Sequence, residues 1–216
     1  MTPLDVRVMD LKSGLNLFVL KGEPFLLDYR DFDIYVDEGK TVTVVDKGFT
    51  VSVDPQENFS KSSADLILVT SEEHYNHSTV ERLCGKNTCV VVPSSLEEDI
   101  PCQDTERIQT GEVMDIFGIE VEAHSLGDGI GYRFVMRGTS FYVSGDTDSI
   151  ENSQELESRI NICFLSLKDL EPEEVVKAAV RIKPEKTVPY LFGGEEPDLK
   201  GLSAELEDRS VDCSIP

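Results

Sequence analysis

The feature that most constrains the fold is an apolar run that ends abruptly in a short polar loop. The run, Ala64–Val69, is rich in branched residues and is typical of a buried strand. The polar stretch Thr70–Ser78 follows it, and Ser78 with Glu81 has the spacing of a capping box, which predicts a helix beginning at Ser78. Two of the three histidines in the chain therefore lie on a loop that rigid elements hold on both sides.

Four side chains of this loop carry atoms that bind transition metals. Imidazoles and carboxylates are the usual nitrogen and oxygen ligands of zinc and its neighbours. A solvated loop without a metal would have the same composition, because short clusters of His and Glu are common on surfaces, so the local sequence leaves both interpretations open. The candidate ligands are Glu72, His74, Asn76 and His77.

Length and cysteine content bound the class of protein. A chain of 216 residues buries a substantial core and forms one domain or two. It contains no apolar run of about 18 residues, so no membrane span is expected, and its first residues lack the basic and apolar regions of a signal peptide. Five cysteines without framework spacing predict buried or free thiols in a reducing cytoplasm.

The charge balance is strongly acidic. The chain has 42 Asp and Glu against 20 Lys and Arg, a formal net charge of −22. A surface of that sign repels phosphate backbones, so nucleic acid is not expected as a ligand. The acidic residues are dispersed, which fits either adaptation to a salty interior or an ordinary acidic protein, and net charge alone does not separate the two.

Further strands predict where the remaining polar residues lie. The segment 113–123 is predicted to be a β-hairpin turning near Phe117–Gly118, and it leads to His124, the third histidine. A histidine at a strand end also fits a residue that only hydrogen-bonds to backbone. The segment 139–148 is predicted to be a strand that leads into Gly-Asp-Thr, where Asp146 is either a site residue or the cap of a turn. The short strands at 15–20 and 25–29 are expected to form an edge hairpin.

Taken in order, these motifs resemble the metallo-beta-lactamase superfamily, with its loop pattern T-H-x-H-x-D-H, and in particular its UlaG-like branch of metal-dependent hydrolases. The resemblance covers Ile34–Phe192 and implies an α/β (α+β) fold, a four-layer αββα sandwich. The many short strands with few helical segments agree with this. We expect a single domain over residues 1–216, with 1–33 as an N-terminal β extension outside the resemblance. Residues 201–216 are expected to be an acidic tail, a short helix with a frayed end.

The resemblance also implies a ligand set. One ion would be held by Glu72, His74 and His124, and a second by Asn76, His77, Asp146 and Leu191. Leucine cannot bind a metal and a neutral amide is a poor ligand, so we expect one divalent ion, Zn, Mn or Fe, in a degenerate site. Asp146 would orient a metal-bound water. Asp54, which ends another strand, is expected to organise the loop and not to bind metal.

By resemblance, the function is then metal-dependent hydrolysis of a small-molecule substrate of the ester, amide, lactone or phosphoester type. The substitutions at Glu72, Asn76 and Leu191 keep two alternatives open. One is a binding or structural protein that kept the fold and lost its metal and catalysis. The other uses a metal for sensing or redox chemistry. The sequence leaves the oligomeric state open.

Overall fold

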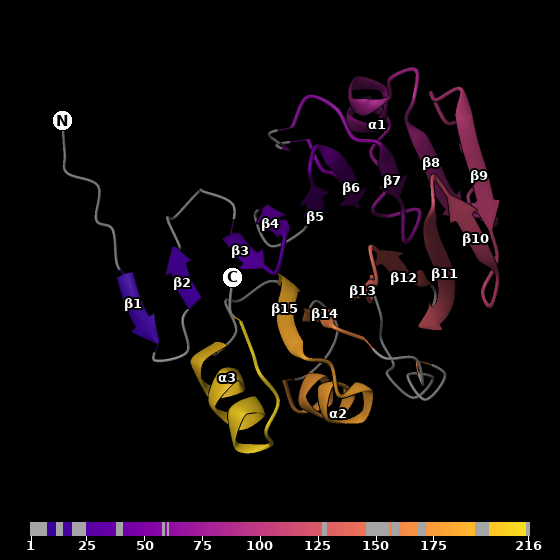
Figure 1. Cartoon of the computed structure of the whole chain (residues 1–216). Coiled ribbons are helices and arrows are strands. Elements are labelled where there is room, and N and C mark those ends of the chain that lie inside the picture. The colour runs from indigo at the N-terminus through magenta and orange to yellow at the C-terminus, as the bar shows by residue number, and fades with distance from the viewer. Residues whose placement is uncertain are drawn as a thin grey trace.

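Two large sheets dominate the molecule, with a two-stranded sheet at one end beside β3 (Figure 1). The computed structural model describes residues 8–11, 15–18, 25–37, 41–57, 59, 61–126, 129–145, 156, 160–167, 172–192 and 199–214. The small sheet pairs β1 Val8–Leu11 with β2 Leu15–Phe18. Strands in the large sheets follow one another in chain order.

The first large sheet has seven strands and the second has six. The first contains β3 Phe25–Tyr29, β4 Phe32–Asp37, β5 Thr41–Asp46, β6 Phe49–Val53, β7 Leu66–Leu68, β8 Cys89–Pro93 and β9 Asp104–Ile108. The second contains β10 Val113–Ile116, β11 Ile119–Leu126, β12 Gly129–Met136, β13 Thr139–Val143, β14 Ile162–Leu167 and β15 Lys186–Phe192. The described helices are α1 His77–Leu83, α2 Pro172–Ile182 and α3 Leu199–Asp208.

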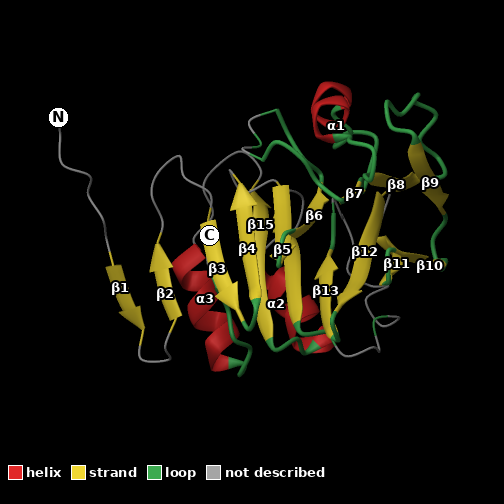
Figure 2. Ribbon diagram, turned by 45° about the horizontal axis from the view of Figure 1, so that its top comes forward, coloured by secondary structure: helices red, strands yellow, loops and turns green. Residues whose placement is uncertain are grey.

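Side-chain alternation along the strands builds the layers. In β7, Leu66 and Leu68 enter the core between the two sheets, whereas Ile67 packs in the outer layer with α1. In β14, Phe164 enters the central core, and Cys163 packs outward with α2 and α3. Figure 2 shows α2 and α3 on one side of the strands and α1 apart from them. The αββα sandwich expected from the sequence is confirmed.

One rim of the sandwich collects the carboxyl ends of parallel strands from both sheets. Strands β6 to β9 run parallel, as do β13 to β15. Hydrogen bonds join the sheets there. The hydroxyl of Tyr132 donates to the Val69 carbonyl over 2.9 Å, and the Ile130 amide donates to the Thr70 carbonyl over 2.9 Å. The polar loop predicted to carry the site leaves β7 at this rim.

Two local predictions were wrong, the pairing of the N-terminal strands and the cap of the first helix. The N-terminal strands do not pair with each other, because β2 pairs with β1 and β3 pairs with β4. The first helix begins at His77, and its cap is Asn76 and not Ser78. In the tail, α3 agrees with the predicted short helix, and the frayed end stays a prediction because 215–216 lie outside the described residues. The Thr187 amide donates to the Asp212 carbonyl over 2.7 Å, and the Ser214 amide donates to the Thr187 carbonyl over 2.8 Å.

The cysteine prediction was wrong for one pair. Cys84, which caps the end of α1, forms a disulfide with Cys102. Cys89, Cys163 and Cys213 are thiols, as predicted. The disulfide removes the cysteine argument for a reducing compartment, so a cytoplasmic location stays a prediction. Among the described helices, none has both the length and the apolar character needed to cross a membrane.

Candidate functional site

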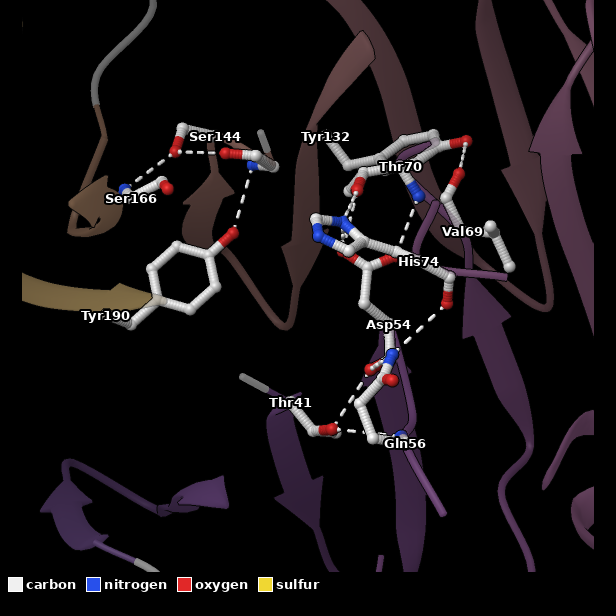
Figure 3. Close-up of polar contacts among 11 residues, drawn as sticks. Thr41, Asp54, Gln56, Val69, Thr70, His74, Tyr132, Ser144, Ser166 and Tyr190 are labelled. Atoms are coloured by element: carbon white, nitrogen blue, oxygen red, sulfur yellow. Dashed lines mark hydrogen bonds and ion pairs between the residues drawn. The ribbon is translucent and has the colours of Figure 1, made fainter. Parts of the chain in front are cut away.

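The rim is organised by a carboxylate that immediately follows β6. Asp54 is 2% exposed and takes a left-handed backbone conformation with φ 51°. Its Oδ1 accepts the Thr70 amide over 2.8 Å, and its Oδ2 accepts the Thr70 hydroxyl over 2.6 Å (Figure 3). The Asp54 carbonyl in turn accepts the Thr41 hydroxyl over 2.9 Å. The prediction that Asp54 organises the loop is confirmed, since both carboxylate oxygens hold Thr70, the second residue after β7.

These contacts determine which ring nitrogen of His74 carries the hydrogen. Its Nδ1 lies 3.0 Å from the Thr70 hydroxyl oxygen and 3.3 Å from Asp54 Oδ2. Because the Thr70 hydroxyl donates its own hydrogen to Asp54, its oxygen accepts, so the hydrogen bond network assigns a hydrogen to Nδ1. In the neutral ring the lone pair is then on Nε2. The backbone is fixed as well, because Gln56 Nε2 donates to the His74 carbonyl over 3.2 Å.

His77 shows a similar arrangement at the surface. Its Nδ1 lies 3.2 Å from the Tyr75 hydroxyl, which donates to the Asp99 carbonyl over 3.2 Å. The Tyr75 oxygen therefore accepts from Nδ1, and the neutral imidazole again has its lone pair on Nε2. Both histidines of the loop are held in the tautomer that presents Nε2 to a ligand or an ion. Unlike His74, His77 is exposed.

Asn76 has a structural role. Its Oδ1 accepts the Thr79 amide and the Ser78 hydroxyl, each over 2.9 Å, which is the usual work of an N-cap residue. The amide oxygen is thus committed to α1, and the remaining amide nitrogen is only a donor. Glu72, at the other end of the loop, is exposed. In the loop, the Nε2 atoms of His74 and His77 therefore remain as nitrogen donors, whereas the Asn76 oxygen is used by the helix cap.

His124 lies on β11, on the face that points away from the central core. Its neighbour Ala123 is in that core, so alternation turns His124 outward. There its Nε2 lies 3.5 Å from Glu122 Oε2, and its ring lies 6.0 Å from the ring of Tyr142, centroid to centroid. Among the described residues, no group of three or more His, Cys, Asp or Glu side chains is arranged to hold a metal ion.

Asp146 lies outside the described residues, so the prediction that it completes the site stays a prediction. The residue before it, Gly145, is described and packs against Thr70. The Gly145 amide donates to the hydroxyl of Tyr190 over 3.0 Å. The backbone of Leu191 belongs to β15, and leucine has no ligand atom.

Three residues of this rim are not predicted from the sequence. One is Thr70, although a threonine four residues before a histidine, at the end of an apolar run, can bond the imidazole ring. The others are Tyr132 and Tyr190, whose hydroxyls bond the rim at Val69 and Gly145. Their contacts join segments 45 or more residues apart, so no local pattern signals them.

Comparison with known proteins identifies the family of this chain. Residues 25–190 match the model of the beta-lactamase superfamily domain, which includes β3 and so begins earlier than the resemblance at Ile34. A solved structure of a candidate metal-dependent hydrolase from Parabacteroides distasonis superposes with a TM-score of 0.75 at 19% identity, covering 99% of this chain and 98% of that one.

Two further structures share the fold. The metallo-beta-lactamase fold protein YhfI from Bacillus subtilis gives a TM-score of 0.67 at 8% identity, covering 83% of this chain and 89% of that one. The diiron beta-hydroxylase CmlA from Streptomyces venezuelae gives 0.65 at 14% identity, covering 92% of this chain and 54% of that one. At such identities the likeness shows the fold, while the family-model match shows membership. The chain belongs to the beta-lactamase superfamily, and its sandwich is the metallo-beta-lactamase fold.

Proposed function

We propose that this chain is a hydrolase of a small molecule that uses one divalent metal ion held at His74. The observation that carries the proposal is the contact of His74 Nδ1 with the Thr70 hydroxyl and the Asp54 carboxylate. Metal-binding histidines almost always donate their second ring nitrogen to a carboxylate or a similar acceptor, which fixes the tautomer and raises the basicity of the ligating nitrogen. A histidine that only fills space does not need two polar partners on one nitrogen.

The other ligands we propose for this ion are Glu72, His124 and Asp146, from the order of motifs in the chain. A carboxylate in place of an imidazole at Glu72 would favour Mn²⁺ or Fe²⁺ over Zn²⁺. When bound, such an ion lowers the pKa of a water and polarises a carbonyl or phosphoryl oxygen. Asp146 would orient the attacking water, and the buried Asp54–Thr70 pair would keep His74 in place during the reaction.

Metal content is the direct test. The chain, purified without chelator and dialysed separately against Zn²⁺, Mn²⁺ and Fe²⁺, is expected to retain one ion. His74→Ala should abolish retention, and Asp146→Ala should remove both ion and activity against ester, lactone and phosphoester panels. Glu81→Ala, at an exposed carboxylate of α1 outside the candidate ligands, serves as the matched control. Retention of ion and activity by both alanine variants would reject these roles.

A second function is favoured by the role of Asn76. Because the Asn76 oxygen caps α1, a position that usually supplies a metal ligand has a structural role here. That fits a protein which kept the fold for binding and does no chemistry. In that case, wild type would unfold cooperatively at the same midpoint with and without each metal, and elemental analysis would find no stoichiometric ion.

A further inference from the structure

A groove of about 470 Å³ lies at the rim opposite the candidate site. Its residues stand at the amino ends of strands β6 to β9 and at the β10–β11 turn, whereas Asp54 and Thr70 follow carboxyl ends. Strands β9 and β10, the edge strands of the two sheets, lie side by side there (Figure 1). The volume is in the range of small-molecule sites. The lining residues are Phe49, Asp65, Lys86, Asn87, Asp104 and Phe117.

Phe117 is the residue that sets this groove apart from ordinary surface. It occupies the first position of a two-residue hairpin turn with φ 57°, and its side chain is 53% exposed. Such turns favour Asn, Asp or Gly there, and a bulky side chain at positive φ is an outlier. In the corresponding turns of this chain, the residues before Gly48 and Gly138 are Lys47 and Arg137, whose charged side chains are hydrated by water. An exposed aromatic held in strain is a marker of function.

The groove is rigid on its aromatic side and on its polar side. The ring of Phe117 meets that of Phe49 edge to face, with centroids 6.2 Å apart. Asp65 is fixed because its Oδ2 accepts the Thr50 amide over 2.8 Å. The opposite wall is held by a covalent bond. Cys84 and Cys102, which form a disulfide, lie two residues before Lys86 and Asp104 respectively. A site built in advance loses less entropy when it binds a ligand.

The electrostatics of the groove favour a cation. Two carboxylates, Asp65 and Asp104, and one ammonium group, Lys86, line the groove. The negative field reaches the neighbouring strand, where burial first and then Asp104 and Glu106 raise the pKa of the Cys89 thiol to about 12. The net charge of −22 attracts cations to the whole surface and repels anions. Aromatic rings add a cation–π surface.

We propose that this groove binds a small organic ammonium compound whose flat apolar body packs against Phe117 and Phe49 while its charge meets Asp104. The site is separate from the rim that carries His74, and it does not depend on a metal or on hydrolysis. Phe117 and Asp104 determine its specificity, Phe117 for the apolar body and Asp104 for the charge.

Three probes of one shape test the proposal on the full chain: phenethylammonium, phenethyl alcohol and phenylpropionate. Backbone amide NMR is expected to show saturable shifts at Asn87, Asp104 and Gly118 with the ammonium, weaker shifts with the alcohol and none with the carboxylate. Asp104→Asn should weaken the ammonium roughly tenfold and leave the alcohol unchanged, since one charge pair is lost. Phe117→Lys, which places in this turn the residue type found at position 47, should weaken both.

Val113→Lys is the matched control, because Val113 is an exposed apolar residue on β10 that does not line the groove. It should leave binding of the ammonium unchanged. Near-equal affinity for the three probes, absence of saturable shifts at these amides, or equal loss in Val113→Lys and Phe117→Lys would each overturn the proposal. Thermal unfolding of every variant separates loss of binding from loss of fold.

Discussion

Gly145 approaches Thr70 so closely that a Cβ on Gly145 would lie 2.7 Å from Thr70 Cβ. This contact joins the second residue after β13 in one sheet to the second residue after β7 in the other. Thr70 also binds Asp54 and His74, so the packing of the two sheets and the orientation of His74 depend on the same side chain.

Gly145→Ala should therefore damage both stability and the site. The added methyl overlaps Thr70, and φ 65° is unfavourable for alanine, so we expect a loss of about 2–5 kcal/mol in the free energy of unfolding. Gly138→Ala is the control: φ is 78° but the space is open, so strain alone should cost about 1–2 kcal/mol. Urea unfolding measures both. Equal losses would mean that the close approach to Thr70 carries no energetic weight.

Replacing Thr70 tests the tautomer assigned to His74. Thr70→Val leaves a buried carboxylate oxygen and an imidazole nitrogen short of one partner, so stability should fall by about 1–3 kcal/mol. Thr70→Ser keeps the hydroxyl and should retain most of it. The two variants can be compared by urea unfolding, and by nitrogen-15 NMR of the imidazole, which separates the Nδ1–H from the Nε2–H form. A wild-type His74 imidazole in the Nε2–H form would refute the assignment.

The disulfide closes a loop of 18 residues and should stabilise the chain by restricting its unfolded state. Replacing both Cys84 and Cys102 by serine is expected to cost about 3 kcal/mol. Intact mass under non-reducing conditions should show two hydrogens fewer than the fully reduced chain. Cys163→Ser, at a buried thiol, controls for the loss of a sulfur atom. Five alkylated thiols in the native, unreduced chain would contradict the pairing.

Stability should fall at high pH because of Tyr29. Burial, and then its hydrogen bond to Glu185, raise the pKa of the phenol from 10.0 to about 12. Between those values the unfolded chain binds fewer protons than the folded one, so the stability present below pH 10 is lost as the pH rises through about 12. The phenolate absorbance of wild type minus Tyr29→Phe should have its midpoint near 12.

Glu185→Gln removes the negative charge beside the phenol and should lower that midpoint. The substitution keeps an oxygen acceptor of similar size, so it isolates charge from packing. A difference curve already centred at 10.0 in wild type would show that Tyr29 ionises as if exposed.

Much of the sandwich follows from local pattern. The run Ala64–Val69, the turn at Phe117–Gly118 and the helix from Pro172 are readable because hydrophobic periodicity and turn chemistry act over a few residues. The helix start was misplaced by one residue, because Asn76 and Ser78 are both good caps and only the fold selects between them.

Local pattern along the chain predicts the layered β-rich fold and the polar loop that carries His74 at the end of a buried strand. The partners of His74, the capping role of Asn76, the outward direction of His124 and the Cys84–Cys102 bond are visible only in the folded chain. The difference comes from the range of the interactions. Strand and helix patterns are set by neighbours along the chain, whereas a hydrogen bond such as that between Thr70 and Asp54 depends on the register of strands distant in sequence.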